Sequence, residues 1–217
     1  GRGLKGADIR FSVNGEAVSL AWTDDSIPGV PAQSYYAVKT YEDGDKINIT
    51  AAAEGMKAVS SATVVPSRFP LTSINFVLKG GEPNQLQFWI HFTDNAQTKD
   101  YYALKVERKR QFWNDSKYSV ENSSLTLNLD DEPLLNTSSG LDDILMIENE
   151  FYRNLYYWDD TKIQGKSYKV RLNTNYEADY EDDFITPDGV EHIKCQVKYR
   201  ISLYSLSEEF YRYLKSL

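Results

Sequence analysis

Clustered carboxylates are the side chains of this sequence whose type and spacing could most readily hold an ion or do chemistry. They form the runs Asp24-Asp25, Asp130-Asp131-Glu132, Asp142-Asp143, Asp159-Asp160 and Glu181-Asp182-Asp183. Calcium prefers clustered carboxylate and carbonyl oxygens, so the acidic segment near the C-terminus is a candidate calcium site. Its candidate ligands are Asp179, Glu181, Asp182 and Asp183. No run has the spacing of an EF-hand loop, so solvated loop carboxylates are the alternative interpretation.

The motifs of common enzyme classes are missing from the sequence. The two histidines, His91 and His192, lie in strand-like patterns and outside the H-E-x-x-H spacing of zinc sites. Residues 165–167 resemble the end of a phosphate-binding loop, but Asp160 stands where that loop needs its first glycine. No G-x-S-x-G is present, and Cys195 lies within an alternating strand pattern. We therefore predict no catalytic residue and no cofactor, with a carboxylate-pair hydrolase as the enzymatic alternative.

Aromatic side chains are the second chemical signal. The sequence contains 16 Tyr and 4 Trp, and they are densest between Tyr152 and Asp160. Tyrosine and tryptophan rings combine a flat apolar face with a polar edge, which suits contacts with sugars and with proteins. An exposed platform for a glycan would consist of Tyr152, Tyr156, Tyr157 and Trp158. Core packing is the alternative, because the same rings fill the interiors of β proteins.

Charge and composition exclude several classes of partner. The chain carries a formal net charge of −8 with a sequence pI near 4.9, and basic residues gather only in the short run 107–110. An acidic protein repels a phosphate backbone, so we predict no nucleic-acid binding. No run approaches the roughly 18 consecutive apolar residues of a membrane-spanning helix. Because Cys195 is the one cysteine, the sequence can form no internal disulfide.

Alternating apolar and polar residues dominate the chain and predict a mainly β protein. The clearest strands are predicted at residues 7–13, 16–22, 33–41, 44–54, 57–66, 71–79, 84–92, 100–113, 166–174 and 191–206. We also expect a short strand at 124–129, a short helix and then an irregular segment within 139–160, and an acidic loop at 175–189. Pro66 and Pro70 cannot donate to a central ladder and mark a seam. The prediction is two antiparallel, immunoglobulin-like β-sandwich modules, residues 1–66 and 67–217.

The C-terminal residues predict a short amphipathic helix directly after the last strand. Ser205 and Glu208 have the spacing of a capping box, in which two side chains satisfy free amides at a helix start. Apolar residues then recur at helical spacing, at Leu206, Phe210, Tyr213, Leu214 and Leu217. We expect this stripe to cover the end or face of the sheet that the chain has just left, with binding of a partner as the alternative.

Four separated segments resemble one bacterial family. Residues 44–74 resemble its Gly-Asp turn, two strands and Val-Pro exit, and residues 91–106 its F-x-D…N-Y-Y strand entry, although Lys99-Asp100 replaces the more usual Glu-Asn. Residues 156–172 are similar to its F-S-D-x-x-F-x-G-K-x-Y segment, and residues 199–217 to its L-x-S-I-S-x-E-Y-Y-R-Y-L ending. The family is the one catalogued as domain of unknown function 4249, and the resemblance extends from about Ala7 to Leu217.

This resemblance implies a location and a neighbour for the protein. Members resemble exported lipoproteins anchored to the outer membrane of Gram-negative bacteria, on its periplasmic or cell-surface side, and are encoded beside TonB-dependent receptors. The family's lipobox cysteine and glycine-rich tail lie outside this sequence, so we expect both ends to be shortened and the lipid anchor to be absent. We expect a non-catalytic accessory protein that binds a receptor or another surface protein. A glycan-binding module, with or without calcium, is the alternative.

Overall fold

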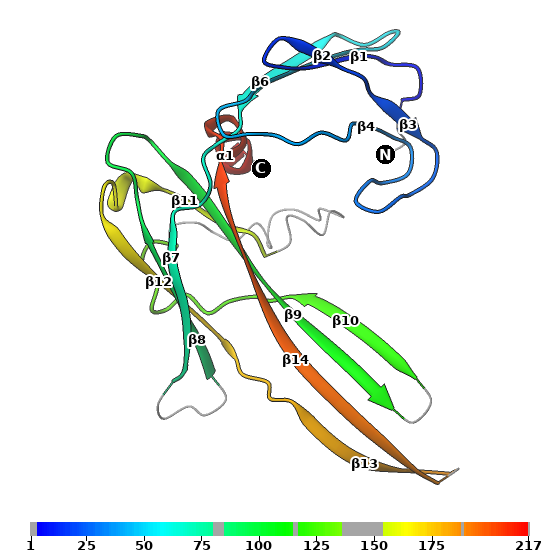
Figure 1. Cartoon of the computed structure of the whole chain (residues 1–217), viewed down its shortest axis with the longest axis vertical. Helices are drawn as coiled ribbons and strands as arrows, with labels where there is room; N and C mark the ends of the chain where they lie inside the picture. The colour runs from blue at the N-terminus through cyan, green and yellow to red at the C-terminus, as the bar shows by residue number, and fades with distance from the viewer. Residues whose placement is uncertain (1–3, 80–84, 115–116, 136–153, 188, 217) are drawn as a thin grey trace. The chain divides into compact units, whose positions relative to one another are not determined.

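The computed structural model describes residues 4–79, 85–114, 117–135, 154–187 and 189–216 (Figure 1). The chain divides into two compact units, one of residues 1–68 with 207–210 and one of residues 69–206 with 211–217. Antiparallel strands dominate both, and a short helix ends the chain, which confirms the predicted mainly β fold class. Within the described ranges, no helix combines the length and apolar character that a membrane crossing requires.

The smaller unit contains a four-stranded sheet and a two-stranded sheet. The larger of these has the order β2-β1-β5-β6 and consists of β1 (Asp8–Val13), β2 (Glu16–Val18), β5 (Lys46–Ala52) and β6 (Val59–Val64). β3 (Ala21–Thr23) pairs with β4 (Ser34–Tyr36). The β1–β2 hairpin turns at Asn14-Gly15 with φ angles of 52° and 83°, the left-handed backbone that favours this dipeptide in tight hairpins. Val13 is the one fully buried apolar side chain among residues 4–68.

The larger unit is built from two further antiparallel sheets. The first has the order β12-β8-β7 and consists of β7 (Leu71–Leu78), β8 (Gln85–Thr93) and β12 (Ser167–Asn175). The second has the order β10-β9-β14-β13, with β11 also on β9. Its strands are β9 (Tyr101–Asn114), β10 (Tyr118–Ser124), β11 (Tyr156–Asp159), β13 (Tyr180–Thr186) and β14 (Gly189–Leu206). β9 and β14 pair along most of their length and form the long ribbon in Figure 1.

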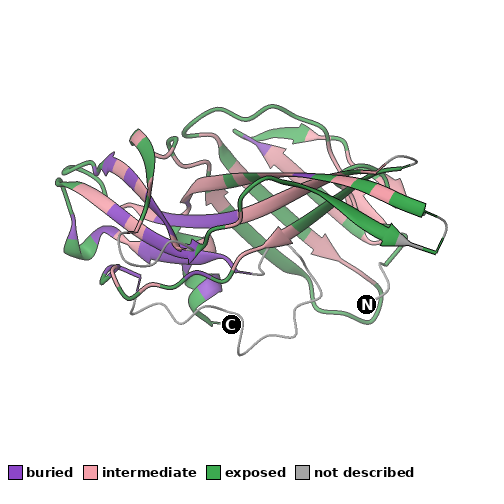
Figure 2. Ribbon diagram, turned by 90° about the horizontal axis from the view of Figure 1, so that it is seen from below, coloured by how far each residue is buried: buried purple, intermediate pink, exposed green. Residues whose placement is uncertain are grey.

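The core of the larger unit lies between its two sheets. Strand alternation places Leu86, Phe88, Ile90 and Phe92 of β8 on one face, and all four are buried. Figure 2 shows the buried parts of the chain in purple. The four β8 residues belong to one hydrophobic cluster with Leu104 and residues of β9, β11 and β12. Fully burying such a side chain contributes about 1.5–3 kcal/mol, so most of the hydrophobic stabilisation of the described chain is concentrated here.

The C-terminal helix α1 (Glu208–Ser216) begins two residues later than the capping box predicts. The amide of Phe210 donates to Ser207 Oγ at 3.3 Å, so Ser207 rather than Ser205 caps the helix. The reason is that β14 continues through Leu206, and Ser205 is used as the ladder partner of Tyr102.

The buried side of α1 packs on the sheet that the chain has just left, as predicted. Tyr211 and Leu214 are buried, whereas Tyr213 is 48% exposed. The ring of Tyr211 lies 4.7 Å from that of Tyr101 on β9, centroid to centroid. Tyr157 of β11 donates its hydroxyl to the Leu214 carbonyl at 3.2 Å. The helix thus covers the end of the β9–β14 ribbon.

In the smaller unit, the strand expected at 16–22 is divided between β2 and β3, and the strand expected at 33–41 is reduced to β4. Three segments of the larger unit also differ from the sequence prediction. The strand expected at 124–129 does not form, and only Asn128 makes an isolated bridge there, to Asn173. The strand β10, which was not predicted, precedes it, because Tyr118–Ser124 pairs with the extension of β9 beyond the core. The expected acidic loop contains β13, whose carboxylates remain in water because it is an edge strand. The segment expected to be irregular contains the buried strand β11. The helix expected within 139–150 lies outside the described residues.

Candidate functional site

On β7, the side chains that point to the same side of the sheet as the core residues of β8 are exposed to solvent. Ile74, Phe76 and Leu78 lie opposite buried residues of β8, with Phe76 opposite Phe88. Directly paired residues share a face, yet Ile74 is 41%, Phe76 69% and Leu78 54% exposed. β7 is also the edge of its sheet, with β8 as its one strand partner in the described chain. The second sheet therefore does not cover this strand.

An apolar cavity of about 690 Å³ opens beside these side chains. Its lining residues are Ile74, Phe76, Leu86, Phe88, Tyr176, Glu177, Ala178, Asp179, Val197, Tyr199 and Ile201. We call it the β7–β14 groove. On β14, Val197, Tyr199 and Ile201 are on the same face as the buried Cys195, which is the face toward the core. The groove is thus an extension of the core that is open to solvent.

Ion pairs fix the wall of this groove at residues 176–179. Glu177 accepts hydrogen bonds from Arg110 Nε at 2.6 Å and Nη2 at 2.7 Å, and pairs with Arg108 Nη1 at 2.7 Å. The hydrogen bond from Arg110 lowers the pKa of Glu177 against the effect of partial burial, and the charge of Arg108 adds to the lowering. The Glu177 amide also donates to the Tyr199 hydroxyl at 3.1 Å. This wall is therefore held in place without a ligand.

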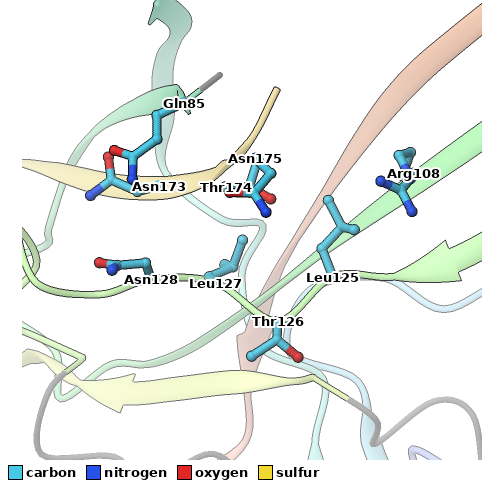
Figure 3. A pocket seen from close by; sticks show the side chains of 9 residues that line it. All are labelled: Gln85, Arg108, Leu125, Thr126, Leu127, Asn128, Asn173, Thr174 and Asn175. Atoms are coloured by element: carbon cyan, nitrogen blue, oxygen red, sulfur yellow. The ribbon is translucent and has the colours of Figure 1, made fainter. Parts of the chain in front are cut away.

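A second cavity, about 400 Å³ in volume and lined by both polar and apolar residues, includes the same Arg108 (Figure 3). Its other lining residues are Gln85, Leu125, Thr126, Leu127, Asn128, Asn173, Thr174 and Asn175. Gln85 Oε1 and Arg108 Nε are buried without a hydrogen-bond partner in the described chain. Buried polar atoms are normally bonded, so this cavity suits ordered water or a small hydroxylated molecule.

Three carboxylates gather where two of the family-like segments meet. Oxygens of Asp94, Asp100 and Asp160 lie within 4.8 Å of one another, the one such group of potential metal ligands among the described residues. Asp94 accepts from the Tyr102 hydroxyl at 2.6 Å and from the Gly165 amide at 2.8 Å. Through these two hydrogen bonds, Asp94 links the β8–β9 loop to β9 and to the turn that precedes β12.

Asp160 is the fully buried member of this group and is also supplied with internal donors. It accepts from the Asp100 amide at 2.8 Å and from the ammonium of Lys99. Partial burial opposes protonation of Lys99, but hydrogen bonding to Asp160 and the charge of Asp159 outweigh it and raise the pKa of Lys99. The ammonium of Lys99 neutralises the carboxylate where a metal cation would otherwise bind. The arrangement is therefore a structural contact between residues 99–100 and Asp160.

The acidic residues predicted as calcium ligands do not converge in the structure. Asp179 precedes β13 and accepts from the Val197 amide at 2.7 Å. Glu181 and Asp183 share one face of β13 and both bond to His192, whereas Asp182 lies on the other face. Neighbouring strand residues point to opposite faces, which is why four clustered carboxylates in the sequence become separate groups.

The aromatic residues predicted as a platform belong to the core instead. Tyr156, Tyr157 and Trp158 form β11 and are buried, and Tyr152 lies outside the described residues. The Trp158 ring packs 5.6 Å from that of Tyr102, centroid to centroid. Burial leaves these three rings no free face for a sugar and favours the core-packing interpretation of the segment.

The groove was not predicted from the sequence. The alternation of Ile74, Phe76 and Leu78 predicts an ordinary core-facing strand. The three residues do pair with core-facing residues of β8, as this pattern requires. The exposure of β7 depends on how β14 and residues 176–179 pack against its sheet. No local pattern in the sequence indicates that packing. The same holds for an exposed ring pair, Trp113 and Tyr118, on the far part of the ribbon.

Comparison with known proteins bears on the whole chain. None of the curated proteins matches it. One family model matches residues 2–217, a range that includes all four segments in which family-like motifs occur. The chain therefore belongs to the family described as domain of unknown function DUF4249.

Proposed function

We propose that this protein is a non-catalytic binding protein, exported and lipid-anchored to the outer membrane, that acts as an accessory component of a TonB-dependent uptake system. Its partner is the outer-membrane receptor or another surface protein of that system. The location is what the family resemblance implies, and the β7–β14 groove supports the binding role.

The uncovered face of β7 is the observation that carries the proposal. Ile74, Phe76 and Leu78 are in register with the core but remain in contact with water. Full burial of one such side chain contributes about 1.5–3 kcal/mol, so a partner that covers all three gains a substantial free energy. Contiguous apolar patches on soluble domains mark interaction sites for this reason.

The groove favours an extended protein segment as its occupant. β7 is an edge strand, and the backbone groups on its outer side have no strand partner in the described chain. A segment added there pairs through main-chain hydrogen bonds and directs every second side chain into the groove. The wall at Glu177 is fixed in advance by Arg108 and Arg110, which lowers the ordering cost of binding.

The test is a pull-down of the full-length, lipidated protein from its native outer membrane in detergent, followed by mass spectrometry. The variant Phe76→Asp places a charge in the groove at a position that is 69% exposed, so it leaves the core intact. The matched control is Ile185→Asp, because Ile185 on β13 is 91% exposed and does not line the groove.

The proposal expects one receptor barrel to co-purify at a stoichiometric level with the wild-type protein and with Ile185→Asp, and to be lost with Phe76→Asp. A receptor that remains bound to Phe76→Asp contradicts the role of the groove. A wild-type protein that purifies alone contradicts the accessory function itself.

A further inference from the structure

The β9–β14 ribbon carries unpaired positive charge on the face that points away from the core. Lys109 of β9 lies directly opposite Lys198 of β14, and Arg200 follows Lys198 on the same face. No hydrogen bond or ion pair of these three side chains occurs in the described structure, although Glu107 lies opposite Arg200. Glu107 is instead paired with Lys105 at 3.8 Å. We call Lys109, Lys198 and Arg200 the basic face.

The opposed lysines of this basic face, Lys109 and Lys198, are unfavourable for the folded protein by themselves. Like charges placed directly opposite each other on a sheet destabilise it. The chain as a whole is acidic, with a net charge of −8. The lack of carboxylates paired with these lysines in the described structure therefore does not reflect a shortage of acidic residues in the chain. Locally unfavourable placements of this kind are characteristic of functional sites, where a ligand supplies the missing charge.

The residues that follow along the ribbon give the chemistry of that ligand. The next pair on the same face is Gln111 opposite Gln196, and Gln111 Nε2 donates to the Tyr118 hydroxyl at 2.7 Å, which leaves Gln196 as the amide open to a ligand. Beyond this pair, Trp113 lies between Lys194 of β14 and Tyr118 of β10. The Trp113 and Tyr118 rings are 5.3 Å apart with a 42° tilt, and both are exposed. Amides bond to hydroxyl groups and flat rings stack on the apolar faces of sugars.

We infer that this face binds a linear glycan that bears carboxylates, with the basic face holding the carboxylates and the Trp113–Tyr118 pair stacking on a sugar ring. From Lys109 to Trp113 the track spans roughly 13 Å at about 3.3 Å per strand residue, so the ligand must be extended to contact both ends. The guanidinium of Arg200 offers a planar fork that matches a carboxylate. A partner of hydroxyl-poor chemistry, such as an acidic peptide, leaves the amide and ring groups unused.

The site is separate from the β7–β14 groove. Val197, Tyr199 and Ile201 line the groove, whereas Lys198 and Arg200 alternate with them and point to the opposite face of the same strand. Binding of a glycan and binding of a protein partner therefore use different surfaces, and each can be removed without the other.

The experiment is isothermal titration of the full chain with a galacturonic-acid oligomer at low salt. Its fully methyl-esterified form is the uncharged control and polyglutamate the non-sugar control. The variant Lys109→Gln/Lys198→Gln removes the opposed pair. Lys39→Gln/Lys57→Gln removes two exposed charges of the smaller unit and so matches the change in net charge.

The inference expects binding of the acidic oligomer but not of its methyl ester, and affinity about tenfold weaker in Lys109→Gln/Lys198→Gln with no change in the control variant. Trp113→Ala should further lower the affinity for the acidic sugar oligomer. A raised melting temperature of Lys109→Gln/Lys198→Gln without ligand shows that this variant is folded and relieved of repulsion. Absence of binding by the acidic oligomer, equal binding of polyglutamate, or equal loss in both lysine variants overturns the inference.

Discussion

Phe76 on β7 and Phe88 on β8 are direct cross-strand partners on one face of a sheet, yet Phe88 is 4% exposed and Phe76 69%. The pair marks the line at which the core of the larger unit opens into the β7–β14 groove. Because the register continues across that line, Phe76 is placed as a core residue and lacks only a cover. This relationship is the basis of the proposed binding role.

Truncation of these two rings should have very different effects on stability. Phe88→Ala removes a fully packed ring and is expected to lower the free energy of unfolding by about 3–5 kcal/mol. Phe76→Ala is expected to lower it by less than about 1 kcal/mol, because its ring is mostly in water. Urea denaturation of both variants measures this difference. Equal losses would mean that Phe76 is packed in solution and that no groove is present.

The turn at Gly165 should tolerate no larger residue. Its φ is +69°, and an added Cβ would lie 2.7 Å from Ala96 Cβ and 3.1 Å from the Ala96 Cα. Gly55 has a similar φ of +74° with open space around it, so Gly55→Ala is the matched control. We expect Gly55→Ala to cost about 1–2 kcal/mol and Gly165→Ala clearly more, since it adds a steric clash that displaces the amide bonded to Asp94. Thermal denaturation compares the two variants.

Removal of the buried Glu132 carboxylate should destabilise the larger unit. Glu132 accepts from the Tyr168 hydroxyl at 2.8 Å and from the amides of Leu134 at 2.9 Å and Arg171 at 2.8 Å. Glu132→Ala leaves these donors buried and unbonded, so we expect a loss of about 3 kcal/mol or more. Tyr168→Phe removes one of them and should cost about 1 kcal/mol.

A spectroscopic measurement separates this effect from a general loss of packing. Burial, and then the hydrogen bond to Glu132, raise the pKa of Tyr168 to about 12. Absorbance titration of folded Glu132→Ala should therefore find a lower pKa for this hydroxyl. An unchanged pKa would contradict the role of the bond.

The charge of His192 should persist well above neutral pH. Hydrogen bonds to Asp183 and then Glu181 raise its pKa to about 9, against a small opposing effect of burial. Since the folded pKa lies above the ordinary 6.5, the stabilisation from this group is complete below pH 6.5 and is lost as the pH rises through about 9. NMR titration of the His192 ring measures the pKa, and Glu181→Gln/Asp183→Asn should return it toward 6.5. A wild-type value near 6.5 would mean that the two bonds are absent in solution.

Local patterns in the sequence were sufficient for the longest strands and for the presence of the C-terminal helix. Alternation places β7, β8, β9, β12 and β14 correctly within a few residues, because each has one face toward a core. β13 was missed because Glu181, Asp182 and Asp183 resemble a solvated loop, and only the pairing with β14 makes this segment a strand. Ser207 replaced Ser205 as the helix cap for the same reason, since ladder pairing continued to Leu206.

Sites were harder to predict than strands because they depend on which surfaces tertiary packing leaves open. The aromatic run at Tyr156–Trp158 and the acidic run at Glu181–Asp183 are dense in sequence, but the first is buried and the second is divided between two faces. The groove and the basic face combine residues from strands distant in sequence. Neither Phe76 nor Lys198 is unusual in its own segment; each becomes so through its cross-strand partner.

A photo-cross-linker placed at position 76 tests the central claim most directly. A benzoylphenylalanine in place of Phe76 puts the reactive ring in the groove, and the same residue in place of Tyr118 puts it on the opposite face of the larger unit's ribbon. After irradiation of cells that carry the full-length lipidated protein, mass spectrometry identifies the cross-linked peptides. The account predicts cross-links from position 76, and not from position 118, to one extended segment of an outer-membrane receptor or its partner protein. Cross-links from position 118 alone, or from position 76 only to this chain, would contradict it.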